Sequence, residues 1–83
     1  MMKFLHIEDA KYLDGFKVWV RFSDGQEGEV DLHDELHGSI FQPLKEKDYF
    51  RNFSLVGHTL AWPNGADFAP EHIHSILRQI QSA

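Results

Sequence analysis

The sequence contains no cysteine and only three prolines among its 83 residues. Without cysteine, the chain has no disulfide, no thiolate metal ligand and no thiol nucleophile, so its stability depends on packing or on a partner. It also lacks any apolar run long enough for a signal peptide or a membrane span. These absences predict a cytoplasmic protein that does not enter a membrane, and the length predicts a single domain over residues 1–83.

Basic residues are also few, since eight Lys and Arg stand against thirteen Asp and Glu for a net charge of −5. They are scattered, and the densest group, Lys45 to Lys47, is interrupted by Glu46. Direct binding of nucleic acid needs a continuous basic face, so the sequence predicts none. The acidic surplus favours a small, basic protein partner, although a solvated acidic surface is the simpler interpretation.

Residues 16–22 and 27–32 alternate between apolar and polar or charged side chains, which is typical of half-buried strands. A two-residue loop between them would place the apolar Phe22 beside Glu27 on the same face of the sheet. A three-residue loop that ends at Gly25 instead pairs Phe22 with Gln26 and keeps the faces separate. We therefore predict a type I turn with a bulge and a positive φ at Gly25. The charged face of this hairpin carries Lys17, Trp19, Arg21, Glu27, Glu29 and Asp31.

The remaining segments predict short elements around this hairpin. Residues 3–13 favour an irregular first strand with a bulge near Asp9, and residues 45–51 favour a short helix. Residues 54–56 and 59–62 are predicted to be short strands. The connection over residues 33–52 has four expected core anchors, Phe41, Leu44, Phe50 and Phe53.

A closing helix is predicted to begin at Pro70, because proline suits the first helical position. Its apolar stripe consists of Ile73, Ile76, Leu77 and Ile80. Ala69 stands where a capping Ser, Thr, Asp or Asn is preferred, so the cap is weak. The elements together predict an α+β fold. It has a small, mainly antiparallel sheet of four to five strands, a C-terminal helix on one face and a short helix in the central connection.

Three separated stretches resemble a known family in their order and spacing. They are FSDGQEGEVDL at residues 22–32, IFQPLKEKDYF at 40–50 and WPNGADFAPEHI at 62–73. They resemble the small bacterial domain-of-unknown-function family 2442, from which Ala69 departs because the family usually has Ser or Thr there. The resemblance implies a compact α+β module, often encoded beside another small protein in an arrangement like a toxin–antitoxin pair. Some relatives are fused ahead of a helix-turn-helix, and we expect no such extension here.

Six histidines raise the question of a metal site. His33 and His37 have the spacing of a zinc-protease helix, but Asp34, not glutamate, follows the first histidine. His72 and His74 lie two apart on the predicted helix and point in different directions, so they cannot chelate one ion together. We therefore predict no metal, no cofactor and no catalytic residue.

Two functional hypotheses follow. The first is a non-catalytic protein–protein interaction module, antitoxin-like, that binds a small, basic protein encoded nearby, with a homodimer as the other assembly. Its expected contact residues are Trp19, Arg21, Glu29, Trp62, Asn64 and Asp67. The second is a small-ligand or divalent-cation module whose site is centred on Asp24, Asp31, Asp67 and Asn64. The simpler interpretation gives these carboxylates structural roles, and makes residues 62–67 a connector with Trp62 packed on the closing helix.

Overall fold

Two antiparallel sheets form the β part of the computed structural model, which describes residues 5–81 and the side chains as far as Leu77. The larger sheet has the order β1-β2-β3 and consists of β1 (Ile7–Asp14), β2 (Lys17–Phe22) and β3 (Glu27–Asp31). The smaller sheet consists of β4 (Ser54–Val56) and β5 (Thr59–Ala61). The predicted α+β class is confirmed, and its five strands are divided between two sheets.

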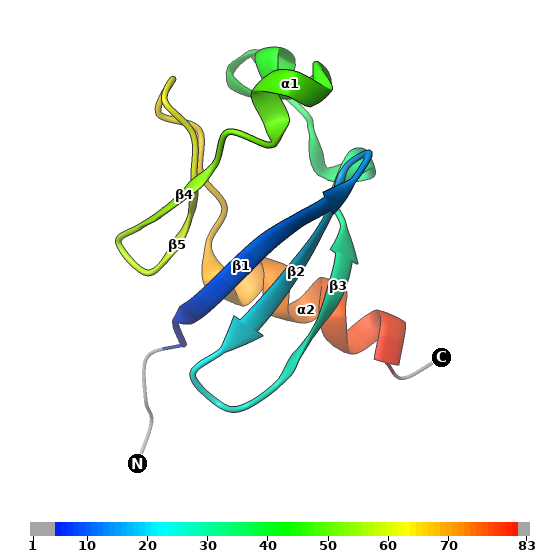
Figure 1. Ribbon diagram of the computed structural model, residues 1–83, viewed down its shortest axis with the longest axis vertical. Helices are drawn as coiled ribbons and strands as arrows, with labels where there is room; N and C mark the ends of the chain where they lie inside the picture. The colour runs from blue at the N-terminus through cyan, green and yellow to red at the C-terminus, as the bar shows by residue number, and fades with distance from the viewer. Residues whose placement is uncertain (1–4, 82–83) are drawn as a thin grey trace.

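Short helical segments fill the connection between the two sheets, as predicted. They are the 3₁₀ segments η1 (His33–Glu35) and η2 (Ser39–Lys45) and the helix α1 (Lys47–Phe50). The C-terminal helix α2 (Pro70–Gln81) begins at the predicted proline and lies behind the larger sheet (Figure 1). Within residues 5–81, no helix is both long and apolar enough to cross a membrane.

The β2–β3 hairpin has the register that its alternation predicts, with Arg21 opposite Glu27. The Phe22 N–H donates to the Gln26 carbonyl at 2.8 Å, and Gly25 has a φ of 90°. The three-residue loop and its bulge are therefore confirmed. Because a side chain is strained at this φ, glycine is the residue that allows the turn.

β1 pairs with β2 less regularly. Its register shifts between Ile7 and Asp9, and again between Tyr12 and Asp14. The first shift is the bulge predicted near Asp9. Residues 3 and 4, where the predicted strand begins, lie outside the described residues. The two shifts change which side chains of β1 reach the open face of the sheet, so they matter for the site below.

The main core lies between the larger sheet and α2. The apolar face of β2 and β3 is completely buried and comprises Val18, Val20, Phe22 and Val30. From α2, Ile73 and Leu77 are buried in the same cluster, and Ile76 packs against it. Ile80 lies outside the described side chains. Complete burial of an aliphatic side chain contributes about 1.5–3 kcal/mol to stability. Because α2 covers this face of the sheet, only the other face is left for function.

A second, aromatic part of the core joins the connecting segment to the smaller sheet. The ring centre of Phe50 lies 5.2 Å from that of Phe16 and 5.7 Å from that of Trp62. The expected anchors are confirmed: Leu44 and Phe50 are completely buried, whereas Phe41 and Phe53 are partly buried against the cluster.

Candidate functional site

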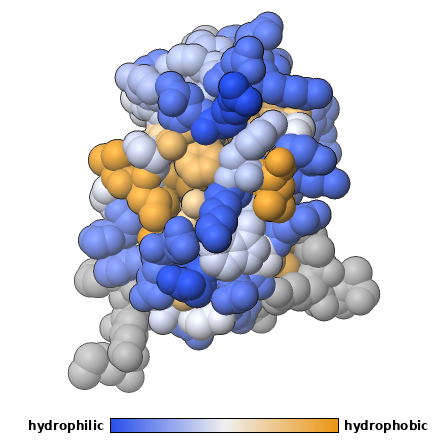
Figure 2. Space-filling view, in the orientation of Figure 1, coloured by the Kyte–Doolittle hydropathy of each residue, from blue (hydrophilic) through white to orange (hydrophobic). Residues whose placement is uncertain are grey.

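The larger sheet carries exposed charged side chains on the face that α2 does not cover. Figure 1 shows α2 behind the sheet, which leaves this face towards the viewer. Alternation along β2 and β3 buries the apolar residues and leaves the charged ones exposed. The surface over this sheet is largely hydrophilic, whereas hydrophobic side chains gather over the β4–β5 hairpin (Figure 2). We use the term charged face for Lys11, Lys17, Trp19, Arg21, Glu27, Glu29 and Asp31.

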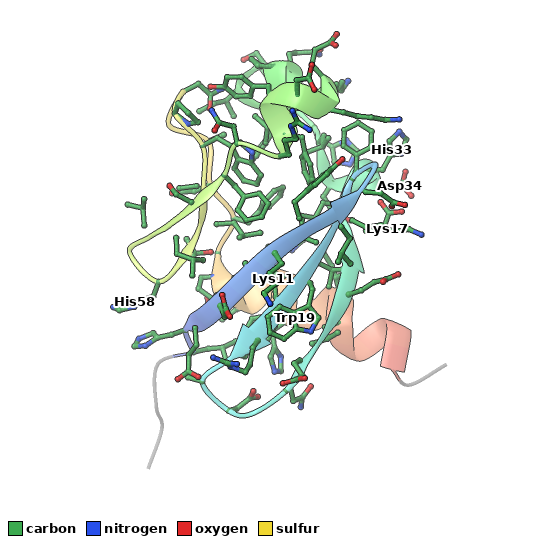
Figure 3. The ribbon with its side chains drawn as sticks, in the orientation of Figure 1. Lys11, Lys17, Trp19, His33, Asp34 and His58 are labelled. Atoms are coloured by element: carbon green, nitrogen blue, oxygen red, sulfur yellow. The ribbon has the colours of Figure 1, made fainter. Side chains whose placement is uncertain are left out.

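Trp19 lies in the middle of β2 and is partly buried within the charged face. Lys11 Nζ is 5.7 Å from its ring centre, and Arg21 Cζ is 6.0 Å from it. At an exposed site, such a cation is attracted to the ring by about 0.5–1 kcal/mol. Figure 3 shows Lys11 and Trp19 together on the side of the sheet turned towards the viewer. The face therefore presents one large ring flanked by two cations.

Sequence reasoning missed Lys11, which lies directly opposite Trp19 on β1. Only the pairing of β1 with β2 could have identified it, and the two register shifts in β1 hide that pairing from a simple alternation. β1 also supplies Glu8, whose Oε1 is 3.8 Å from Arg21 Nε. Exposed ion pairs of this kind contribute about 0–1 kcal/mol, so Arg21 is held only weakly.

The charges on this face differ between the strands, and β1 supplies the acid Glu8 as well as Lys11. The cations come from β1 and β2, and β3 carries only acids, Glu27, Glu29 and Asp31. The two outer acids lie opposite cations of β2, whereas Glu29 lies opposite Trp19. The pairing of Asp31 with Lys17 follows the predicted register. The face thus has a basic centre and an acidic edge.

Trp62 differs from the expectation of an exposed contact residue. Its side chain is 4% exposed, and Nε1 donates to the Phe50 carbonyl at 2.7 Å. Its ring also contacts those of Phe53 and Phe68. Trp62 therefore belongs to the aromatic core beneath the connecting segment.

Asn64 and Asp67 lie on the exposed part of the same loop. Asn64 Nδ2 donates to the Ile40 carbonyl at 2.8 Å, and its Oδ1 accepts the Ala66 N–H at 3.0 Å. Asp67 forms an isolated β-bridge with Ala61. Asn64 thus ties the loop to η2, which gives it a structural role in addition to its exposure.

The three carboxylates of the second hypothesis have separate local partners. Asp24 Oδ1 accepts the Gln26 N–H at 3.0 Å in the hairpin turn, and Asp31 Oδ1 accepts the His33 N–H at 2.9 Å at the far end of β3. Asp67 lies in the loop before α2. In the part of the chain that the structure describes, no three His, Asp or Glu side chains are arranged to hold a metal ion.

His33 and His37 lie at the surface beside η1, which ends at Glu35. No helix therefore presents the two histidines on one face. Together with four other residues, they line an open pocket of about 530 Å³. The other lining residues are Phe16, Asp34, Leu36 and Lys45. His33 Nδ1 is 3.1 Å from Asp34 Oδ1, so the ring has an exposed partner already.

The two histidines of α2 point to different partners, as the sequence predicts. His72 Nε2 is 2.6 Å from Glu35 Oε1, and His74 Nε2 is 2.8 Å from Asp24 Oδ2. Partial burial opposes ionisation of Asp24, but hydrogen bonds from the Gln26 N–H and from His74 outweigh it. The pKa of Asp24 is therefore below its ordinary value of 3.8. These contacts attach α2 to both ends of the β3 segment.

Comparison with known proteins gives one match. A family model described as "Protein of unknown function (DUF2442)" matches residues 7–78, which include all five strands and most of α2. No curated protein and no solved structure matches the chain. The family description names no activity, ligand or partner.

Proposed function

This chain belongs to the DUF2442 family of proteins of unknown function, and we propose that it is a non-catalytic protein–protein interaction module. Its partner is a small protein, which it binds in the manner of an antitoxin. The match confirms the family that the three sequence motifs resemble. Since the family description gives no activity, the proposal rests on the charged face and on the overall charge.

The observation that carries the proposal is the position of Trp19. A tryptophan on an open strand face, with Lys11 at 5.7 Å and Arg21 at 6.0 Å, combines a large apolar surface with charges. Tryptophan and arginine are enriched among the residues that dominate binding energy at protein interfaces. The opposite face of this sheet is buried under α2, so the charged face is the side that a partner can reach.

The charge of the chain supports a basic partner. The net charge is −5, and β3 lines one edge of the face with acids. Complementary charge speeds association and selects partners. Because Lys and Arg do not form a continuous patch in the sequence, the proposal does not include direct binding of nucleic acid. We also propose a cytoplasmic location, for which the lack of cysteine is the support.

The second hypothesis, a small-ligand or divalent-cation module, has less support. Asp24 and Asp31 lie at opposite ends of the β3 segment, and each accepts a local backbone hydrogen bond. An amide NMR titration with Zn²⁺, Mg²⁺ and common metabolites separates the two hypotheses. Localised shifts at Asp24, Asp31 or Asp67 would favour the ligand module.

The test of the interaction module is Trp19→Ala, measured against the product of the neighbouring gene after co-expression and pull-down. We expect the affinity to fall by at least about tenfold, because truncation of a central interface residue commonly costs about 2 kcal/mol or more. Circular dichroism should show an unchanged fold. Arg51→Ala, an exposed residue of the connecting segment, is the matched control and should bind normally. Normal binding by Trp19→Ala would refute the proposal.

A further inference from the structure

Half of the backbone groups of β3 point away from β2. The Phe22 N–H donates to the Gln26 carbonyl at 2.8 Å, and the Leu32 N–H donates to the Phe16 carbonyl at 2.9 Å. Antiparallel partners alternate between hydrogen-bonded and non-hydrogen-bonded pairs, so every second residue between these two bonds faces β2. Glu29 is three residues from both Gln26 and Leu32, so it belongs to a pair that is not hydrogen-bonded to β2. Its N–H and carbonyl are therefore directed to the outer edge of the sheet.

No strand pairs with this outer edge in the part of the chain that the structure describes. The order of the larger sheet ends at β3, and no backbone hydrogen bond joins Glu29 to another element. The opposite edge, at β1, is partly occupied. There the Ile7 N–H donates to the His58 carbonyl at 2.9 Å, and the Ala10 N–H donates to Asp9 Oδ1 at 2.9 Å. β3 is thus the edge that can accept another strand.

The side chains along this edge are acidic at every second residue, and all three are exposed on the charged face. Glu27 lies opposite Arg21, and Asp31 lies opposite Lys17. Glu29, in the middle, has Trp19 across the ladder and no cation directly opposite. A cation placed on the outer side of β3 would supply the opposite charge that β2 does not provide there.

We propose that the edge of β3 accepts an extended, basic segment of the partner protein as an added strand. The backbone of that segment bonds to the outward N–H and carbonyl of Glu29, as in other cases of strand addition. Its Lys or Arg residues, at every second position, face Glu29 and Asp31 across a strand spacing of about 4.8 Å. This inference rests on the proposed function and specifies how the charged face takes its partner.

A second copy of the chain is a poorer occupant of this edge. Antiparallel pairing of two β3 strands about their centre would place Glu29 opposite Glu29 and Glu27 opposite Asp31. Like charges directly opposite each other destabilise a strand pair, and natural sheets use such charges against edge-to-edge association. The acids that keep two copies apart are the groups that attract a basic strand.

Glu29→Pro tests the added strand, because proline removes the outward N–H and leaves the hydrogen bonds to β2 intact. Glu29→Gln is the matched control, since it removes the same charge and keeps the N–H. The probe is a peptide of about seven residues that alternates lysine and threonine, a length typical of a strand. We expect Glu29→Gln to weaken peptide binding by about two- to fivefold and Glu29→Pro by at least about tenfold.

Amide hydrogen exchange on the unmodified protein gives a second measurement that does not depend on the folding of the proline variant. Bound peptide should protect the Glu29 amide from exchange. Equal affinities for the two variants, an unprotected Glu29 amide, or no peptide binding would each overturn strand addition. The proposed function is tested by a different result, since normal binding of the native partner by Trp19→Ala would refute the interaction module but not strand addition.

Discussion

His74 Nε2 lies 2.8 Å from Asp24 Oδ2, a contact between residues 50 positions apart in the sequence. It joins α2 to the turn before β3, and the contact of His72 with Glu35 joins α2 to η1 after β3. The His74 side chain is 15% exposed, and its ring also packs edge-on against Phe22. The helix is therefore held to the hairpin by polar contacts as well as by its buried stripe.

The Asp24 contact predicts a pH-dependent contribution to stability. The pKa of Asp24 is lowered in the folded state, so its carboxylate stabilises the protein above the unfolded pKa of about 3.8. That stabilisation is lost as the pH falls through the folded pKa. We expect the free energy of unfolding of the unmodified protein to exceed that of Asp24→Asn near pH 6, and the difference to shrink as the pH falls through the folded pKa of Asp24. Urea denaturation at several pH values measures both quantities.

His74→Gln provides the control for this prediction. If the hydrogen bond from His74 contributes to the lowered pKa, the Asp24→Asn substitution should have a smaller effect in the His74→Gln background. A difference in unfolding free energy between the unmodified protein and the Asp24→Asn variant that does not change with pH would contradict the assignment.

Trp62→Phe should destabilise the fold, because it leaves the buried Phe50 carbonyl without the indole donor that now lies 2.7 Å away. An unsatisfied buried acceptor costs about 1–3 kcal/mol, and the smaller ring adds a packing loss. Trp19→Phe is the matched control on the open face and should change the free energy of unfolding by less than about 0.5 kcal/mol. Equal losses for the two variants in chemical denaturation would contradict the assignment of Trp62 to the core.

Ala69→Ser should raise the free energy of unfolding by about 0.5–2 kcal/mol. The Ala69 carbonyl accepts the N–H groups of His72 and Ile73, which makes Ala69 the residue that caps α2. Its methyl group offers no acceptor, whereas a serine hydroxyl accepts an N–H of the first turn. Ala69→Gly adds no acceptor and should give a smaller gain. A thermal midpoint that Ala69→Ser leaves unchanged or lowers would count against this cap.

Excess chelator should leave the thermal midpoint unchanged. His33 and His37 lie on a short 3₁₀ segment and the loop after it, so their spacing in the sequence does not produce a chelating helix. A structural zinc ion contributes about 10–16 kcal/mol to folding, so its removal would be obvious in differential scanning calorimetry. A clear fall in the midpoint, absent in His33→Ala, would restore the metal hypothesis.

Much of the fold follows from local patterns in the sequence. The register of β2 with β3 follows from the alternation of side chains between the two faces. Only a three-residue loop keeps Phe22 and Val30 on the same face. The start of α2 at Pro70 and its buried Ile73 and Leu77 follow from helical periodicity. Each of these features depends on residues that are close in the sequence.

The features that the sequence did not predict depend on contacts between distant segments. Alternation identifies strands but does not show which sheet each strand joins, so the separation of β4 and β5 from the larger sheet does not follow from it. Packing of Trp62 was one interpretation of the sequence, but its contact with Phe50 of the connecting segment was not predicted. Lys11 lies on the charged face because the first register shift of β1, between Ile7 and Asp9, moves it to the face opposite the buried Ile7.

The position of α2 also affects how the protein folds during synthesis. The β2–β3 hairpin forms from neighbouring residues, but Ile73 and Leu77, which share its core cluster, are made about 40 residues later. Until those residues leave the ribosome, Val18, Val20, Phe22 and Val30 form an uncovered apolar sheet face. The nascent chain is therefore exposed to aggregation and to chaperone binding for as long as α2 has not emerged.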